Sequence, residues 1–286
     1  MTSREDTRNA LLRQLEQIVG SGHAEFAVED ETEFGHSFYP IPEHIRALDP
    51  NVALVLGDRG AGKTELFKAI QLDGIRPAIA AAAPTERIRA TLLKPIRWRI
   101  GFSGAGTEFP NARRTRDYFR ALSGRESAED FWYAYLVRAL GTDISDLVDD
   151  IPAAISELIA EPGAEVQRIV EIAMSSAQIA VALDKLDEAL ERRDQYLVVS
   201  YDALDAFGGA DQEVMSNGVR ALLRFWTEHI RRWRRIRPKM FLRTDLFRTY
   251  SDKLGADFAK LSAQRTEIFW NDRYLYTILV LSLIHI

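Results

Sequence analysis

The sequence predicts an α/β protein in which helices cover a parallel sheet. Apolar runs at 52–56, 196–202 and 239–245 are typical of strands that are buried on both faces of such a sheet. Long stretches between these runs repeat apolar residues at every third or fourth position, as amphipathic helices do. A glycine-rich turn at 57–64 joins the first run to a helix, and this turn is the strongest functional signal in the chain.

The composition is that of a globular protein. The chain has 286 residues, 47% of them hydrophobic, and a net charge of −5, so no overall field attracts it to nucleic acid. The absence of cysteine excludes disulfides, thiol catalysis and cysteine-bound metals. Residues 1–20 lack the apolar core of a signal peptide, and the apolar tail at 276–286 is too short to cross a bilayer. We therefore expect a cytoplasmic protein with no membrane partner.

Residues 1–50 are predicted to form a short helix and a lead-in segment before the first strand. Residues 4–19 place five apolar side chains on one helical face, which either covers the core or binds a partner. Residues 38–42, FYPIP, are expected to be extended because each proline disfavours a helical conformation in the residue before it. Phe38 or Tyr39 packs in the core or, alternatively, stacks on a nucleotide base.

The turn at 57–64 reads GDRGAGKT and matches the phosphate-binding pattern G-x-x-x-x-G-K-[ST]. Its glycines permit backbone angles that side chains forbid, so main-chain N–H groups can converge on phosphate oxygens. Lys63 is expected to contact the β- and γ-phosphates of ATP, and the Thr64 hydroxyl to bind Mg²⁺. The alternative is an ordinary turn between a strand and a helix. The predicted nucleotide-binding residues are Gly57, Asp58, Arg59, Gly60, Ala61, Gly62, Lys63, Thr64 and Glu65.

The middle of the chain is predicted to be a helical insertion at about 111–194. It follows an alternating strand at 96–102. Apolar residues spaced by three and four between Val166 and Leu190 predict one long amphipathic helix within the insertion.

The run at 196–202 ends in Asp202, which is the candidate Walker B carboxylate that would hold Mg²⁺ opposite Thr64. Ala203 follows, so the glutamate that many ATPases carry at this position is missing. Asp205 is the remaining nearby carboxylate. It acts as a second acid or base, or it is a turn or helix-capping residue.

A cationic segment lies at 220–239. The segment contains eight basic residues and only one acidic residue, Glu228, and aromatic side chains lie between the basic ones in the sequence. The segment either binds DNA phosphates or is a solvated helix end, and the acidic net charge favours the solvated helix end. Its basic residues are Arg220, Arg224, Arg231, Arg232, Arg234, Arg235, Arg237 and Lys239.

Two strands and a tail complete the prediction. The strand at 239–245 would carry Arg243 to the carboxyl edge of the sheet, where we expect it to sense the γ-phosphate. The last strand is predicted at 266–270, with a helix starting near Asp272. The final residues at 281–286, LSLIHI, resemble the translated mosaic end of a transposase used in sequencing libraries. We therefore expect the core at 51–280 to continue past Val280 in the natural chain.

With these motifs in place, the chain resembles bacterial P-loop ATPases of the AAA-like and STAND-like (additional-strand) group. The closest likeness is to defence-linked members whose P-loop reads GxRGAGKT and whose sensor strand reads FLRTD. The likeness covers most of residues 40–280. It implies a P-loop NTPase fold whose five-stranded parallel sheet has the order 5-1-4-3-2, with helices on both faces and a helix-bearing segment before the Walker B strand. It also implies further domains after the fifth strand.

The leading interpretation is an ATP-binding, Mg²⁺-dependent ATPase that acts as a nucleotide-driven switch. Its predicted catalytic residues are Lys63, Asp202, Asp205 and Arg243, and its predicted metal ligands are Thr64 and Asp202. A role in antiphage defence is expected from the resemblance alone, and the expected partners are a second copy of the chain or an effector protein. The alternative, suggested by Ala203, is an ATP-gated binding module without hydrolysis, associated with DNA through 220–239. A small-molecule kinase fits less well because no acceptor pocket is recognisable.

Overall fold

The structure is a computed structural model that describes most of the chain. The predicted helix at 4–19 and the tail at 281–286 lie outside the described residues. Those described are residues 38–103, 112–122, 125–160, 165–205, 211–251, 258–272, 274–277 and 280.

Helices and strands alternate along the chain, with a group of consecutive helices between the second and third strands. In chain order the elements are α3 (Pro42–Ala47), β1 (Leu54–Gly57), α4 (Lys63–Gln71), α5 (Ile75–Ala81), α6 (Glu86–Leu92), β2 (Ile96–Phe102), α7 (Ala112–Ala121), α8 (Arg125–Leu147), α9 (Ala153–Ala160), α10 (Val166–Met174), α11 (Gln178–Arg192), β3 (Tyr196–Tyr201), α12 (Gln212–Arg232), β4 (Ile236–Arg243), α13 (Thr244–Ser251), α14 (Phe258–Ala263) and β5 (Arg265–Ile268).

The five strands form one sheet in which every neighbouring pair is parallel. The α/β class and the five-stranded parallel sheet are therefore confirmed. The strand order is β2-β3-β4-β1-β5, which reads 5-1-4-3-2 from the β5 edge. Gly57 lies beside Arg243 on β4 and Ile268 on β5, so these three strands end together at one edge of the sheet.

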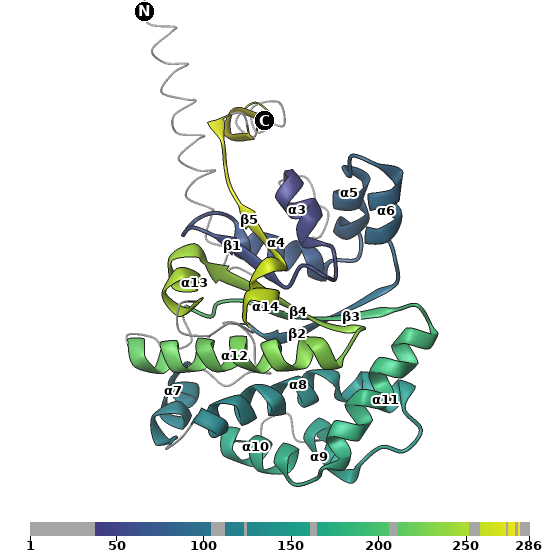
Figure 1. Cartoon of the computed structure of the whole chain (residues 1–286), viewed down its shortest axis with the longest axis vertical. Helices are drawn as coiled ribbons and strands as arrows, with labels where there is room; N and C mark the ends of the chain where they lie inside the picture. The colour runs from purple at the N-terminus through teal and green to yellow at the C-terminus, as the bar shows by residue number, and fades with distance from the viewer. Residues whose placement is uncertain are drawn as a thin grey trace, which may run out of the picture.

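Helices cover both faces of the sheet and bury two apolar clusters (Figure 1). Val55 and Phe241 face the smaller cluster, which they share with α3, α4 and α5. Leu54, Leu56 and Leu242 face the larger cluster, which includes α8, α11 and α12. Alternate residues of β1 therefore point to opposite cores, as the strand pleat requires. This double burial explains why the strands are nearly all apolar.

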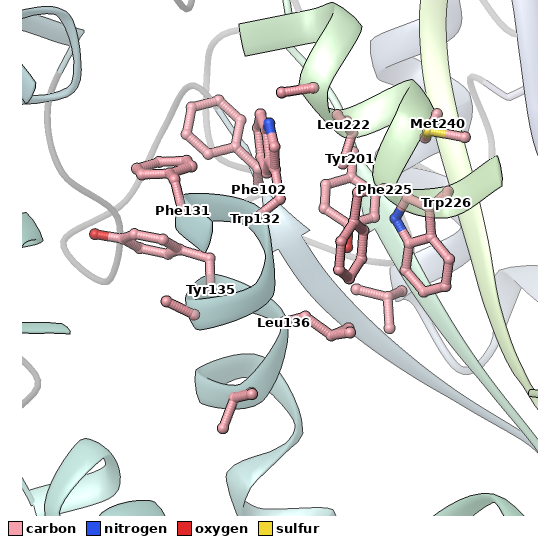
Figure 2. Packing of buried hydrophobic residues seen from close by; sticks show 14 of the residues in the cluster. Phe102, Phe131, Trp132, Tyr135, Leu136, Tyr201, Leu222, Phe225, Trp226 and Met240 are labelled. Carbon is pink, nitrogen blue, oxygen red and sulfur yellow. The ribbon is translucent and has the colours of Figure 1, made fainter. Parts of the chain in front are cut away.

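An aromatic cluster joins the helices after β2 to the sheet (Figure 2). The Trp132 ring of α8 meets Tyr201 of β3 at a centroid distance of 5.8 Å, and Tyr201 meets Trp226 of α12 at 6.2 Å. Trp132 also donates its indole N–H to the main-chain carbonyl of Gly218 at 2.8 Å. This packing holds Tyr201, and with it the carboxyl end of β3, between α8 and α12.

The single helix predicted between Val166 and Leu190 is wrong, because the chain forms α10 and α11 with a break at 175–177. The Ser175 hydroxyl donates to the carbonyl of Ile172 at 2.7 Å. The Ser176 hydroxyl accepts the main-chain N–H of Gln178 at 3.2 Å, at the start of α11. Serine side chains compete for main-chain groups in this way, and here they divide one apolar pattern between two helices.

Two strands end earlier than the sequence predicts. β4 ends at Arg243, and α13 begins at the next residue, so Thr244 and Asp245 are helical. β5 ends at Ile268, which leaves Phe269 and Trp270 beyond the strand.

Lys239 is fully buried inside β4, although the sequence analysis placed it in the cationic segment. Its Nζ donates to the carbonyls of Asp49 at 2.7 Å and Val52 at 2.5 Å. Burial lowers the pKa of Lys239 to about 7, with the Asp49 carboxylate acting in the opposite direction. Lys239 therefore fastens the turn before β1 to β4 and contributes nothing to a cationic surface.

Within the described ranges, none of the helices combines the length and the apolar character that crossing a membrane requires.

Candidate functional site

The candidate site lies at the carboxyl ends of β1, β3 and β4, where a glycine-rich loop leads from β1 into α4. Gly60 and Gly62 have φ angles of +82° and +80°, a left-handed conformation that favours glycine. Gly57 is predicted to need unusual backbone angles, but it is required for lack of space instead. A Cβ on Gly57 would lie 3.0 Å from the Cβ of Ala61. The loop therefore needs its three glycines for two different physical reasons.

Lys63 is the first residue of α4, and its side chain folds back to contact the main chain of the glycine-rich loop. Its Nζ donates to the carbonyls of Gly57 at 3.0 Å and Asp58 at 2.9 Å. Burial lowers the pKa of Lys63, while the nearby carboxylates of Asp205 and Asp202 act against that shift. The ammonium group thus sits between the loop carbonyls and two acidic side chains.

Thr64 and Asp202 are brought together from α4 and the end of β3. The Asp202 carboxylate is buried and accepts hydrogen bonds from the Ala203 main-chain N–H and the Thr64 hydroxyl. Burial nevertheless raises its pKa, and this effect outweighs the hydrogen bonds and the Lys63 charge, which lower the pKa. The two predicted metal ligands are therefore adjacent, as the sequence analysis expected.

Asp205 and Arg243 form the outer part of the site. One guanidinium nitrogen of Arg243 lies 3.8 Å from a carboxylate oxygen of Asp205. A second carboxylate, that of Asp245, accepts from Arg243 Nε at 3.1 Å and from Nη2 at 2.7 Å. These hydrogen bonds raise the pKa of Arg243. Asp245 therefore fixes the direction of Arg243 with a bidentate pair.

Ala203 has a φ angle of +56°, directly after Asp202. A left-handed conformation at a residue with a Cβ costs about 1–2 kcal/mol and marks a constrained backbone. The turn redirects the chain so that the Ala203 N–H bonds back to the Asp202 carboxylate. No pattern in the sequence indicated this strain.

Three predicted binding residues lie at the solvent-facing side of this group. Asp58 and Arg59 are exposed on the loop, and the Glu65 side chain on α4 is 41% exposed, with its carboxylate 4.0 Å from Lys68 on the same helix. The Asp58 carboxylate nevertheless acts through its charge to raise the pKa of Lys63, against the larger effect of burial.

The cationic segment at 220–239 is solvated in part: Arg231, Arg232 and Arg234 are exposed, its other arginines are partly buried, and Lys239 is buried. Four of its arginines pair with carboxylates, three of them from α11 or the turn after it and one from α8; Arg237 donates to the Ile230 carbonyl, and Lys239 is buried. The pairs are Arg224 with Glu129, Arg232 with Asp184, Arg234 with Glu191, and Arg235 with Asp194. The sequence could not indicate this, because the carboxylates lie 41 to 95 positions from their arginines.

Comparison with known protein families, curated proteins and solved structures finds no match to this chain. The geometry of the site therefore carries the functional argument.

The oxygen atoms of Thr64 and Asp202 suit a hard divalent cation that keeps most of its waters. Among the described residues there is no group of three or more His, Asp or Glu side chains that could hold a metal. A cation at this site would therefore take a carboxylate and a hydroxyl from the protein and its other ligands from water and phosphate. That ligand set fits Mg²⁺ bound together with a nucleotide.

Trp270 is a site residue that the sequence analysis missed. It follows β5, and its indole N–H donates to the Ala61 carbonyl of the glycine-rich loop at 3.0 Å. The signal that could have found it is a tryptophan directly after a strand, at the edge of the sheet where ligands of α/β proteins collect. Phe38 and Tyr39 are partly buried against the smaller core, which favours their core-packing role.

Proposed function

We propose that this chain is the ATP-binding core of a Mg²⁺-dependent P-loop ATPase that works as a nucleotide-driven switch. The observation that carries the proposal is the meeting of the glycine-rich loop, Lys63 and the Thr64–Asp202 pair at one edge of a parallel sheet. The strand order, read from the β5 edge as 5-1-4-3-2, is the order expected of the family that the sequence resembles.

The loop and Lys63 would bind the triphosphate. Of the loop amides, that of Ala61 already donates to the Asp58 carbonyl at 3.1 Å, whereas those of Gly60, Gly62 and Lys63 have no main-chain acceptor among the described residues. These N–H groups at the start of α4 are free to bind phosphate oxygens. Lys63 would exchange its two carbonyl acceptors for β- and γ-phosphate oxygens, which a desolvated ammonium group favours strongly.

Thr64 and Asp202 would hold Mg²⁺, which would neutralise part of the negative charge of the triphosphate. In the reaction, a water oxygen forms a bond to the γ-phosphorus and the bond from that phosphorus to the β–γ bridging oxygen breaks. The products are ADP and inorganic phosphate, with the water proton released to solvent or to a nearby base. Asp205 would orient the water, and Arg243 would contact the γ-phosphate; the proximity of both side chains to Lys63 supports these roles.

Phosphate release by the purified chain with Mg–ATP tests this proposal. We expect the wild type to release phosphate and Lys63→Ala to lose at least about a hundredfold in rate, because a charge that stabilises the transition state is removed. Lys68→Ala is the matched control. Lys68 lies on the same helix, and its ion pair with Glu65 is partly exposed at 4.0 Å, so its loss should change the rate less than twofold. Equal rates in wild type and Lys63→Ala would contradict the assignment of the site.

A second function, an ATP-gated binding module without hydrolysis, is favoured by the residue after Asp202. Ala203 supplies no carboxylate, and the carboxylate of Asp205 lies 3.8 Å from the Arg243 guanidinium, with which it forms an ion pair. ATP binding that depends on Lys63, combined with no phosphate release by the wild type, would select this function. A DNA-associated form of this module gains little support, because most cations at 220–239 are paired or buried.

A further inference from the structure

Trp270 contacts the glycine-rich loop from outside the sheet, across 209 positions of sequence. Its Nε1 donates to the Ala61 carbonyl at 3.0 Å, and a Cβ placed on Gly62 would lie 4.0 Å from its Cζ2. The indole therefore packs against the peptide bond between Ala61 and Gly62, which lies immediately before the first residue of α4.

Three other carbonyls of the loop, those of Gly57, Asp58 and Gly62, have donors from within the loop or α4. Lys63 bonds to those of Gly57 and Asp58, and the main-chain N–H of Leu66 bonds to that of Gly62 at 2.9 Å. The Ala61 carbonyl instead takes its donor from a residue beyond β5. The peptide between Ala61 and Gly62 in the glycine-rich loop is thus oriented by a residue in the C-terminal part of the described chain.

The orientation of this peptide decides where one phosphate-binding amide points. The described residues contain no cis peptide bond, and in a trans peptide the C=O and the N–H point in opposite directions. Because the Ala61 C=O points toward Trp270, the Gly62 N–H points to the other side of the loop. Gly62 has φ +80° and tolerates other backbone angles as well, so its own conformation does not fix this direction.

Aromatic side chains hold Trp270 in place. The His44 ring of α3 meets the Trp270 ring edge-on at a centroid distance of 6.0 Å. The Phe38 ring stacks on the His44 ring at a centroid distance of 5.1 Å. His44 is buried, and burial lowers its pKa to about 4 against the effect of the Tyr39 carbonyl, so the ring is neutral at pH 7. The uncharged rings of His44 and Phe38 therefore pack on the side of the indole.

We infer that Trp270 is a positioning residue for the triphosphate: by holding the Ala61 carbonyl, it aims the Gly62 amide at the bound phosphates. The inference rests on the proposed function of the loop. It predicts that the indole N–H, and not only the ring, contributes to nucleotide affinity. It also predicts that binding of a triphosphate to the glycine-rich loop changes the surroundings of the indole, because binding effects between two coupled sites are reciprocal.

Mg–ATP binding to Trp270→Phe tests the inference. Phenylalanine keeps an aromatic ring but has no N–H, so we expect the Kd and the KM for Mg–ATP to rise about fivefold, as for the loss of one hydrogen bond, with kcat changed less than twofold. Trp98→Phe is the matched control. Trp98 is buried in the core beside α4, and its Nε1 has no hydrogen-bond partner among the described residues, so the same replacement there should leave Kd unchanged. Trp270→Phe with the affinity of Trp98→Phe would overturn the inference.

A second measurement on the wild type keeps the inference testable if Trp270→Phe folds poorly. The other four tryptophans, Trp98, Trp132, Trp226 and Trp233, are buried, and Trp270 is partly exposed, so acrylamide quenching reports mainly on Trp270. We expect Mg–ATP to change this quenching in wild type and not in Lys63→Ala. Unchanged quenching at saturating Mg–ATP would contradict a coupling between the glycine-rich loop and the indole of Trp270. Failure of the wild type to bind ATP at all would instead overturn the proposed function.

Discussion

Asp202 illustrates how a residue of the candidate site can reduce stability. The residue is 5% exposed, and the pKa of its carboxylate is raised because burial outweighs two hydrogen bonds and the Lys63 charge. A carboxyl whose pKa is raised by folding binds its proton more tightly in the folded state. The unfolding free energy therefore falls as pH rises from the unfolded pKa through the folded pKa, and the loss is complete above it.

Asp202→Asn should remove this cost and the metal site together. We expect the variant without ligand to unfold at a higher urea concentration than wild type at pH 7 and to lack the wild-type decline in stability above about pH 4. Phosphate release should fall more than about a hundredfold, because the amide is a poor ligand for Mg²⁺. Urea denaturation across pH and a phosphate assay measure both effects. A variant less stable than wild type at pH 7 would show that the carboxylate is held favourably in its ionised form.

Most residues of the site could be predicted from the sequence, since the motif at 57–64 and the strand ending in Asp202 are local patterns. The sequence also offers Asp205 as the remaining carboxylate near Asp202, and it puts Arg243 at the polar end of a strand. The φ of +56° at Ala203 and the Trp270 contact could not be predicted, because both depend on how distant segments pack. Local patterns identify side chains that carry chemistry, whereas tertiary packing decides how those side chains are aimed.

At the scale of elements, Asp187 connects α11 to the start of β4. Its buried carboxylate accepts main-chain N–H groups of Arg234 at 2.9 Å, Arg235 at 2.7 Å and Ile236 at 2.8 Å. These donors lie between the end of α12 and the first residue of β4, so the chain passes from helix to strand without leaving them unsatisfied. Asp187 therefore joins the helices after β2 to the strand that carries Arg243.

Asp187→Ala should destabilise the protein by about 2–4 kcal/mol, because one buried and two part-buried main-chain donors lose a charged acceptor. Glu188→Ala is the control. Glu188 lies next along α11 and makes only an exposed contact with Arg192 at 3.9 Å, so its loss should cost less than about 0.5 kcal/mol. Urea denaturation measures both variants. Equal stabilities of Asp187→Ala and Glu188→Ala would show that water satisfies these amides.

The types of most elements could be predicted, but several of their ends could not. Apolar spacing predicts helical character across α10 and α11, yet it cannot reveal that Ser175 and Ser176 divide the helix. Similarly, the apolar pattern at 239–245 does not show that α13 takes Thr244 and Asp245. Periodicity reports which face is buried, and hydrogen bonds of polar side chains decide where an element stops.

At the scale of the whole molecule, the sheet brings separate segments to one edge. β1 carries the loop, β3 carries Asp202, β4 carries Arg243 and β5 leads to Trp270, while two apolar cores fix the strands from both faces. Because all strands are parallel, their carboxyl ends meet on one side. A ligand bound there would contact the segments that follow β1, β3 and β4, while the segment after β5 contacts the loop through Trp270. This arrangement suits a nucleotide-driven switch.

Calorimetric titration of the chain with ATP, with and without Mg²⁺, tests the central claim most directly. We expect the wild type to bind one ATP per chain, more tightly with Mg²⁺, and Lys63→Ala to bind at least about tenfold more weakly, because a charge-assisted contact to phosphate is lost. Wild type and Lys63→Ala binding ATP with the same affinity, or a wild type that binds no ATP, would contradict the claim that the loop at 57–64 and Asp202 form a triphosphate site.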